Sequence, residues 1–375
     1  MRKRILSFIF MMMLLLPWDV PASAIDVDAG AAVLMDSVTG KVLYEKNAYT
    51  QMGMASTTKI MTAILAIEKG NLQDIVTVSA NAAGLEGTSM YLALGEKVKL
   101  EDLLYGLMLP SGNDAAVAIA EHISGSVEAF AELMNEKAKE IGANQTHFTN
   151  PHGLYDPQHY TTAYDLALIS RHAMQNPVFE EIAGTGTKAV PWEGHKEKKW
   201  LTNANKLLNM YDGCDGIKPG YTPETGRTLV GSATRNGWRV ITVTLNCRGD
   251  WEEHKKMFDY AFNLFQVNRF AYQGMPMSTV RVQEGSEMEV PIGIEGEYAE
   301  VEPIHTQIHT SYEVKVEQPV KAPIEKGQQL GTVIVQPDGM EAKEFPVVAM
   351  ESVKYVKEPT LWSRFSDWVK ETFGF

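Results

Sequence analysis

The sequence predicts an α/β protein of the α+β type, in which one antiparallel sheet packs on helices and a small all-β domain follows. Strand patterns occur on both sides of a mainly helical region that runs from residue 55 to about 185. Strands separated in this way complete one sheet by pairing across the helical region. Near Met275 the composition changes, and short β-rich runs begin to alternate with Gly and Pro turns.

The length and composition limit the number of domains and the kind of core that the chain can form. A chain of 375 residues suits two domains, and an apolar content of 45% is ample for a packed core. The only cysteines are Cys214 and Cys247, so a disulfide framework does not hold the fold together.

The first 24 residues predict a signal peptide. A basic stretch at residues 2–4 precedes an apolar run at 5–16, and Ala22-Ser23-Ala24 forms a small-x-small cleavage site. This segment carries a net charge of +2, so the mature chain carries −15 where the full chain carries −13. The sequence therefore predicts an exported protein whose charge argues against binding nucleic acid and against electrostatic binding to anionic lipid.

Residues 25–273 are predicted to form the first domain. Residues 31–37 and 41–46 flank a turn and indicate a hairpin, while residues 228–234 and 238–245 flank Asn236-Gly237, a strong hairpin signal. A helix that is apolar nearly all round follows Ser56 and ends at Gly70, which indicates a buried helix. Further helices are predicted over residues 100–109, from 114, over 126–141, over 162–174 and over 250–265.

Ser56 and Lys59 are one helical turn apart at the start of that buried helix. Burial and the positive helix N-terminus both disfavour an ammonium, so Lys59 is a candidate base for a nucleophilic Ser56. The alternative is a Ser that caps the helix and a Lys that extends to solvent.

Two further segments carry candidate site residues. Ser111 and Asn113 lie on a tight polar link between two apolar helices, where they can position a proton relay and a substrate amide, although turns also favour these residue types. Lys218 and Gly220 precede the late strands, and there they can offer a cation and an exposed backbone N–H to an oxyanion. The alternative for this segment is a Pro-Gly turn with a solvated Lys.

In order and spacing, Ser56-x-x-Lys59, Ser111-x-Asn113 and Lys218-x-Gly220 resemble the motif set of penicillin-binding proteins and serine β-lactamases. The surrounding sequence is closer to the low-molecular-weight penicillin-binding proteins that act as D-alanyl-D-alanine carboxypeptidases. The segments at residues 105–116, 150–154 and 159–165 carry this likeness. Residues 250–258 are similar to the spore-cortex members of the family in Bacillus-type organisms.

The resemblance implies an antiparallel sheet packed on a helical subdomain, and a penicillin-sensitive serine D,D-carboxypeptidase that acts on peptidoglycan stem peptides. Ser56 would be the nucleophile, Lys59 the base and Ser111 a proton relay. Asn113, Lys218, Gly220 and Tyr221 would bind substrate, and the N–H groups of Ser56 and Tyr221 would form the oxyanion hole. No cofactor or metal is implied. The alternatives are a catalytically weak peptidoglycan- or penicillin-binding protein and a β-lactamase-like hydrolase.

One position departs from the family pattern. The third motif is usually Lys-Thr-Gly, and here Pro219 replaces the Thr whose hydroxyl is expected to help bind the substrate's terminal carboxylate. Carboxylate recognition is therefore predicted to be weaker, or shared with Arg248. The histidines His147, His152, His159 and His172 are scattered without a zinc-binding spacing.

The remaining chain is predicted to form a β domain at residues 274–357 and an amphipathic helix at 358–375. The helix places its apolar residues on one face and is too short and polar to span a bilayer. It therefore predicts peripheral attachment to the outer face of the cytoplasmic membrane, with docking on the protein itself as the alternative. The apolar residues are Leu361, Trp362, Phe365, Trp368, Val369 and Phe373.

Overall fold

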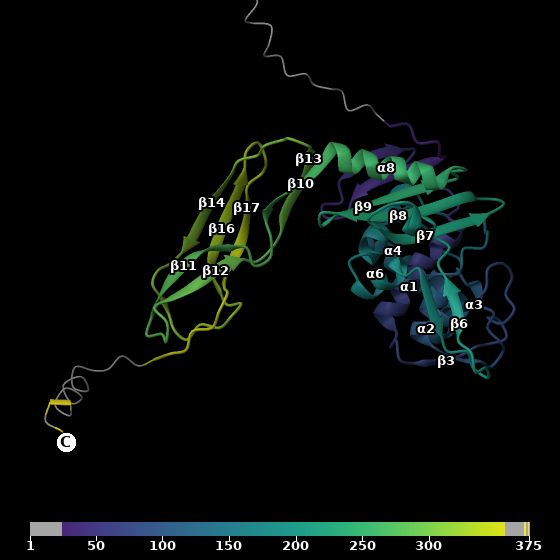
Figure 1. Cartoon of the computed structure of the whole chain (residues 1–375), viewed down its shortest axis with the longest axis horizontal. Helices are drawn as coiled ribbons and strands as arrows, with labels where there is room; N and C mark the ends of the chain where they lie inside the picture. The colour runs from purple at the N-terminus through teal and green to yellow at the C-terminus, as the bar shows by residue number, and fades with distance from the viewer. Residues whose placement is uncertain (1–24, 357–370, 373, 375) are drawn as a thin grey trace, which may run out of the picture. The chain divides into compact units, whose positions relative to one another are not determined.

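The computed structural model describes residues 25–356, 371–372 and 374 (Figure 1). The chain divides into two compact units, one that ends at Leu264 and one that begins at Phe265. Each unit has its own hydrophobic core. The predicted signal peptide at residues 1–24 and nearly all of the predicted helix at 358–375 lie outside the described residues.

A five-stranded antiparallel sheet in the order β2-β1-β9-β8-β7 forms the centre of the first unit. Val33 in β1 lies opposite Val243 in β9, which confirms that strands from the two ends of the helical region pair. Asn236 and Gly237, with φ angles of 53° and 75°, make the predicted turn between β8 and β9. The strands are β1 (Ala31–Asp36), β2 (Val42–Lys46), β7 (Cys214–Thr222), β8 (Gly226–Arg235) and β9 (Trp238–Leu245).

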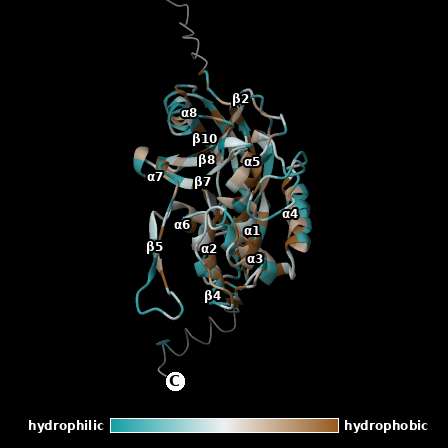
Figure 2. Ribbon diagram, turned by 90° about the vertical axis from the view of Figure 1, so that its right-hand side faces the viewer, coloured by the Kyte–Doolittle hydropathy of each residue, from teal (hydrophilic) through white to brown (hydrophobic). Residues whose placement is uncertain are grey.

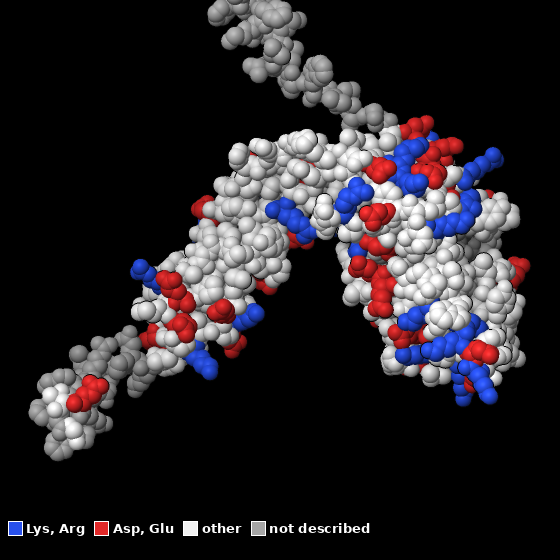
Figure 3. Space-filling model, in the orientation of Figure 1, with Lys and Arg blue, Asp and Glu red and all other residues white. Residues whose placement is uncertain are grey.

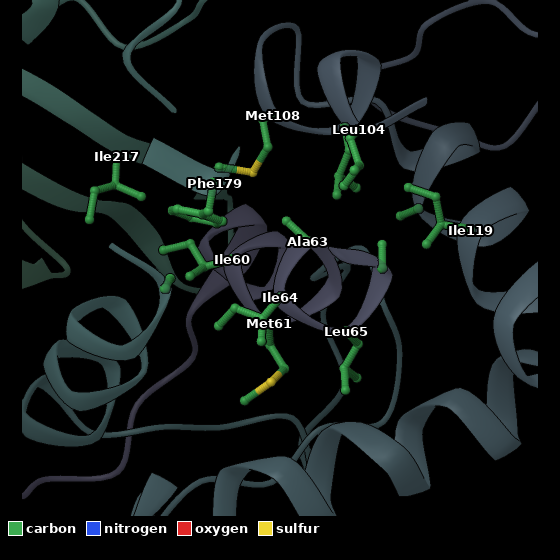
Figure 4. Packing of buried hydrophobic residues seen from close by; sticks show 14 of the residues in the cluster. Ile60, Met61, Ala63, Ile64, Leu65, Leu104, Met108, Ile119, Phe179 and Ile217 are labelled. Carbon is green, nitrogen blue, oxygen red and sulfur yellow. The ribbon is translucent and has the colours of Figure 1, made fainter. Parts of the chain in front are cut away.

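The buried helix predicted after Ser56 is present. A 3-10 turn, η1 (Ala55–Thr58), leads into α1 (Lys59–Lys69), and every residue from Lys59 to Ala66 is buried. Figure 4 shows the apolar side chains of α1 packed among Leu104, Ile119 and Phe179. Because the start of α1 is enclosed on all sides, the Lys59 amine cannot reach solvent in the way the alternative interpretation required.

The other helices surround α1 or cover the opposite face of the sheet. In Figure 1, α8 lies on one side of the sheet, and α1, α2 and α4 lie on the other. Figure 2 shows hydrophobic residues along α1 and hydrophilic residues on the outer side of α4. The remaining elements of this unit are β3 (Ile75–Thr77), β4 (Lys97–Lys99), α2 (Leu100–Met108), α3 (Asn113–Ser124), α4 (Val127–Ile141), α5 (Ala163–Ala173), α6 (Pro177–Gly184), β5 (Thr187–Val190), β6 (Lys199–Thr202), α7 (Leu207–Met210) and α8 (Asp250–Leu264).

The second unit is all-β over residues 265–356, and it begins before the predicted boundary. The sequence placed the division between residues 273 and 274, whereas the compact units meet between Leu264 and Phe265. The reason is that β10 (Phe265–Ala271) pairs with β13 (Tyr298–Pro303), and Phe270 and Ala271 contribute to the second core. A six-stranded sheet contains β11 (Pro276–Gln283), β12 (Glu289–Ile294), β14 (Thr310–Val316), β15 (Val320–Lys321), β16 (Gln329–Pro337) and β17 (Lys343–Ala349).

Cys214 and Cys247 are both free thiols, so no disulfide links the described residues. Lys, Arg, Asp and Glu side chains are mixed on the face that Figure 3 shows. None of the helices in the described residues combines the length and apolar character needed to cross a membrane.

Candidate active site

A cleft of about 420 Å³ lies between η1, the link after α2, the 152–154 loop and strand β7. A cleft of this size suits a small peptide or a drug-sized molecule. The cleft brings together six of the predicted site residues, and Lys59 lies directly behind Ser56. Arg248, also predicted, is exposed and does not line it. The six residues are Ser56, Ser111, Asn113, Lys218, Gly220 and Tyr221.

The Lys59 amine has three close oxygen neighbours. Its Nζ atom lies 3.1 Å from Ser56 Oγ, 2.7 Å from Asn113 Oδ1 and 2.7 Å from the His152 carbonyl oxygen. Burial and the charge of Lys218 lower the pKa of Lys59 well below its ordinary value, against a smaller opposing effect of Asp114. A neutral amine has two N–H donors and one lone pair. It can donate to Asn113 and His152 while its lone pair accepts the Ser56 hydroxyl proton.

Ser111 sits in strained backbone, with a φ of 68°, on the link between α2 and α3. Its Oγ atom is buried and has no hydrogen-bond partner within the described residues. The link is held from outside, because Thr88 Oγ1 donates to the Ser111 carbonyl at 2.6 Å and the Asn113 N–H donates to the Thr88 carbonyl at 2.8 Å. Ser111 therefore presents an uncommitted hydroxyl to the cleft from a fixed position.

The loop that carries Thr88 is itself anchored by Asp114, a residue that the sequence analysis did not single out. The buried Asp114 carboxylate accepts hydrogen bonds from the Met90 and Leu92 N–H groups and from the Ser89 hydroxyl, at 2.6 to 2.9 Å. Asn113 adds a bond from its side-chain amide to the Glu86 carbonyl at 2.7 Å. These contacts fix one wall of the cleft against α3.

Strand β7 forms the opposite wall. Lys218 is fully buried, and burial lowers its pKa to about 7. Gly220 has to be glycine, because a Cβ there would lie 2.8 Å from the Ser56 nitrogen and 2.6 Å from Thr228 Oγ1. The backbone of β7 thus passes immediately beside the turn that carries Ser56.

The proline in β7 also indicates where the neighbouring N–H groups point. Strand β7 is at the edge of the sheet, and a strand tolerates proline where its nitrogen faces away from the neighbouring strand. Backbone N–H groups alternate sides along a strand, so the Tyr221 N–H faces the same open side as the Pro219 nitrogen. The Tyr221 N–H therefore points away from β8.

The structure also places residues in the cleft that the sequence analysis missed. Arg227, Trp251 and Lys206 line it. Arg227 lies at the start of β8, which forms a hairpin with β7, and Trp251 lies at the start of α8, so the strand register and the packing of α8 bring them to the cleft. No group of His, Cys, Asp or Glu in the described residues could hold a metal ion.

Comparison with known proteins decides the family. Residues 19–249 match the D-alanyl-D-alanine carboxypeptidase family, and residues 265–355 match the C-terminal domain of penicillin-binding protein 5. The chain belongs to the D-alanyl-D-alanine carboxypeptidase family. Members of this family are serine-type hydrolases, so the match confirms the predicted enzyme class and the resemblance.

Relatives match both units of this family member. D-alanyl-D-alanine carboxypeptidase DacF of Bacillus subtilis is 36% identical over 358 residues, which cover 92% of this chain and 90% of the relative. DacC of Escherichia coli is also 36% identical, over 371 residues that cover 92% of this chain and 89% of DacC. The crystal structure of penicillin-binding protein 5 from Haemophilus influenzae has a TM-score of 0.68 at 31% identity, covering 88% of this chain and 98% of that one. The predicted fold class is confirmed.

Proposed function

We propose that this enzyme removes the terminal D-alanine from peptidoglycan stem peptides through an acyl-enzyme formed on Ser56. The contact between Lys59 Nζ and Ser56 Oγ, 3.1 Å in a buried site, carries the proposal. The lowered pKa of Lys59 favours an amine that can accept a proton at neutral pH.

In the acylation step, Ser56 Oγ bonds to the carbonyl carbon of the penultimate D-alanine as Lys59 takes the hydroxyl proton. The carbonyl oxygen gains negative charge, and the N–H groups of Ser56 and Tyr221 stabilise it. Both lie where the backbones of η1 and β7 meet, as the close approach of Gly220 to the Ser56 nitrogen indicates.

The tetrahedral intermediate then collapses. The bond between the carbonyl carbon and the leaving amine breaks, the amine of D-alanine takes a proton from the Ser111 hydroxyl, and Ser111 recovers one from the Lys59 ammonium. Asn113 holds both Lys59 and the substrate amide, and the buried Lys218 adds a favourable electrostatic field. A water molecule then gives a proton to Lys59 as its oxygen bonds to the ester carbon. The bond to Ser56 Oγ breaks, Ser56 takes that proton from Lys59, and the shortened peptide leaves with a new carboxylate.

Mass spectrometry of the intact protein with benzylpenicillin, alongside a D-alanine release assay, tests the proposal. We expect one long-lived adduct on Ser56, D-alanine release by the wild type, and neither for Ser56→Ala. Rapid turnover of the adduct would instead support the β-lactamase-like hydrolase. The absence of both adduct and release would support the weak binding protein and overturn the proposal.

We also propose that the protein is exported and works at the outer face of the cytoplasmic membrane, where its peptidoglycan substrate lies. The basic, apolar and small-residue pattern of residues 1–24 and the amphipathic pattern of residues 358–375 support this location. The resemblance of residues 250–258 to the spore-cortex members of the family supports a role in sporulation. Deleting the gene and comparing stem-peptide composition in growing cells and spores tests that role.

A further inference from the structure

The cleft lacks the family's expected partner for the terminal carboxylate of the substrate. Pro219 has neither a side-chain hydroxyl nor an N–H. Arg248, the residue that the sequence offered instead, is exposed and outside the lining of the cleft. The structure contains another arginine that can take this role.

All charged residues that line the cleft are cations, namely Lys206, Lys218 and Arg227. Lys218 is fully buried, and its Nζ lies 3.3 Å from the Pro219 carbonyl oxygen. Lys206 follows Ala204, whose N–H bonds to Leu109 beside the Ser111 link, on the wall opposite β7. Arg227 is therefore the exposed cation that belongs to the β7 side.

The strand register places Arg227 near the altered position. Tyr221 lies opposite Arg227, and Pro219 lies opposite Leu229. Directly opposed residues share a face of the sheet, as do residues two apart on a strand, so Pro219 and Arg227 occupy the same face as diagonal neighbours. Diagonal neighbours are about 7–8 Å apart, a distance that an arginine side chain spans.

The guanidinium of Arg227 is held in one orientation. Its Nε donates to the buried carboxylate of Asp250 at 3.0 Å, and its Cζ lies 5.6 Å from the centre of the Trp251 ring. Asp250 also accepts the Trp251 N–H at 3.0 Å at the start of α8. Within the described part of the chain no hydrogen bond engages Nη1 or Nη2, and the side chain is 40% exposed. Two parallel N–H donors remain for a carboxylate.

We propose that Arg227 binds the terminal carboxylate of the substrate and replaces the hydroxyl that Pro219 lacks. The inference rests on the proposed function, because the carboxylate belongs to a peptide that ends in D-Ala-D-Ala. Arg227 is a specificity-determining residue in this assignment, with Asp250 and Trp251 as its supports. The competing explanation is a purely structural Arg227 that ties α8 to the sheet through Asp250.

Two substrates distinguish these explanations. The first is a diacetylated L-Lys-D-Ala-D-Ala peptide, and the second is the same peptide with a C-terminal carboxamide in place of the carboxylate. In Arg227→Ala we expect kcat/KM for the acid to fall at least about tenfold, because a hydrogen bond to a charged group is lost. We expect the amide to change by less than about threefold, because it never made that bond.

Further variants sharpen the test. Arg227→Lys keeps the charge but loses the paired donors, so it should lose part of the preference for the acid. Pro219→Thr should restore part of the activity of Arg227→Ala and change the wild type little. Arg281→Ala, an exposed arginine in the second unit, is the matched control and should leave the preference unchanged.

Three results would overturn the inference. Equal losses on the acid and the amide would assign Arg227 a structural role. A selective loss in Arg248→Ala with none in Arg227→Ala would assign the carboxylate to Arg248. A loss of preference in Lys206→Ala as large as in Arg227→Ala would indicate general attraction by the cationic cleft. An inactive wild type would instead refute the proposed function.

Discussion

The Nε2 atom of His159 lies 2.7 Å from Oγ1 of Thr58, two residues after Ser56. His159 Nδ1 accepts the N–H of Thr149 at 3.0 Å, so the ring proton is on Nε2, which donates to Thr58. Thr58 Oγ1 in turn donates to the Ala55 carbonyl at 2.8 Å, and Ala55 has a strained φ of 47°. This chain of hydrogen bonds holds the turn from which Ser56 projects.

Thr58→Val should therefore slow acylation, although Thr58 does not line the cleft. The substitution keeps the shape of the side chain and removes both hydrogen bonds, and a small displacement of a reacting group costs about 10²-fold in rate. The rate of benzylpenicillin adduct formation measures the effect. Thr244→Val is the matched control, because Thr244 is also buried and bonds a buried histidine, His254, on the other side of the sheet. A wild-type acylation rate in Thr58→Val would contradict the positioning role.

Lys59→Ala should reduce acylation nearly as much as Ser56→Ala, and the double variant should lose little more. A nucleophile and its base act as one unit, so removing either one disables the same step. Adduct formation and D-alanine release by the three variants check this, with thermal unfolding to confirm that each is folded. Losses that multiply in the double variant would show that the two residues act independently.

The free energy of unfolding should decrease as the pH falls from 7 to 5. Burial lowers the pKa of His254 to about 3 and that of His159 to about 4. Both histidines are neutral in the folded state and protonate near pH 6.5 when unfolded, so their contribution is full above that pH and is lost as the pH falls towards their folded pKa values. At pH 5 each histidine lowers the free energy of unfolding by at most about 2 kcal/mol relative to pH 7.

Urea unfolding at several pH values measures this dependence. His254→Gln should be less stable than the wild type at pH 7 and should show a shallower decrease towards pH 5. Carboxylates protonate mainly below this range, so they contribute little to the comparison. An identical slope in His254→Gln and the wild type would mean that His254 does not contribute to the pH dependence.

Truncation after Lys357 should release a soluble enzyme with unchanged activity on small peptides. At the proposed location the apolar residues of 358–375 would supply the attachment, since a mature chain at −15 is not attracted to anionic headgroups. Each buried aromatic contributes on the order of 1.5–3 kcal/mol. Detergent should therefore remove the full-length protein from membranes and high salt should not. Removal by salt alone would indicate an electrostatic or protein-mediated contact.

Much of the fold was predictable because its signals are local. The apolar run after Ser56, the Asn236-Gly237 turn and the β-rich stretches after Met275 each encode an element within about a dozen residues. The order of the three motifs along the chain was also visible, and so was the chemistry of a serine beside a buried lysine. Whether Lys59 is buried or extends to solvent stayed open until the structure showed its side chain enclosed.

The tertiary structure decided what depends on how strands pair and align. The sequence predicted carboxylate binding that is weaker or shared with Arg248, whereas the register of β7 and β8 brings Arg227 beside Pro219. It placed the domain boundary after residue 273, but the pairing of β10 with β13 moves the boundary to Phe265. Periodicity tells which residues share a face of one strand, but not which strand lies alongside it or how the two are aligned, because register depends on packing across the whole sheet.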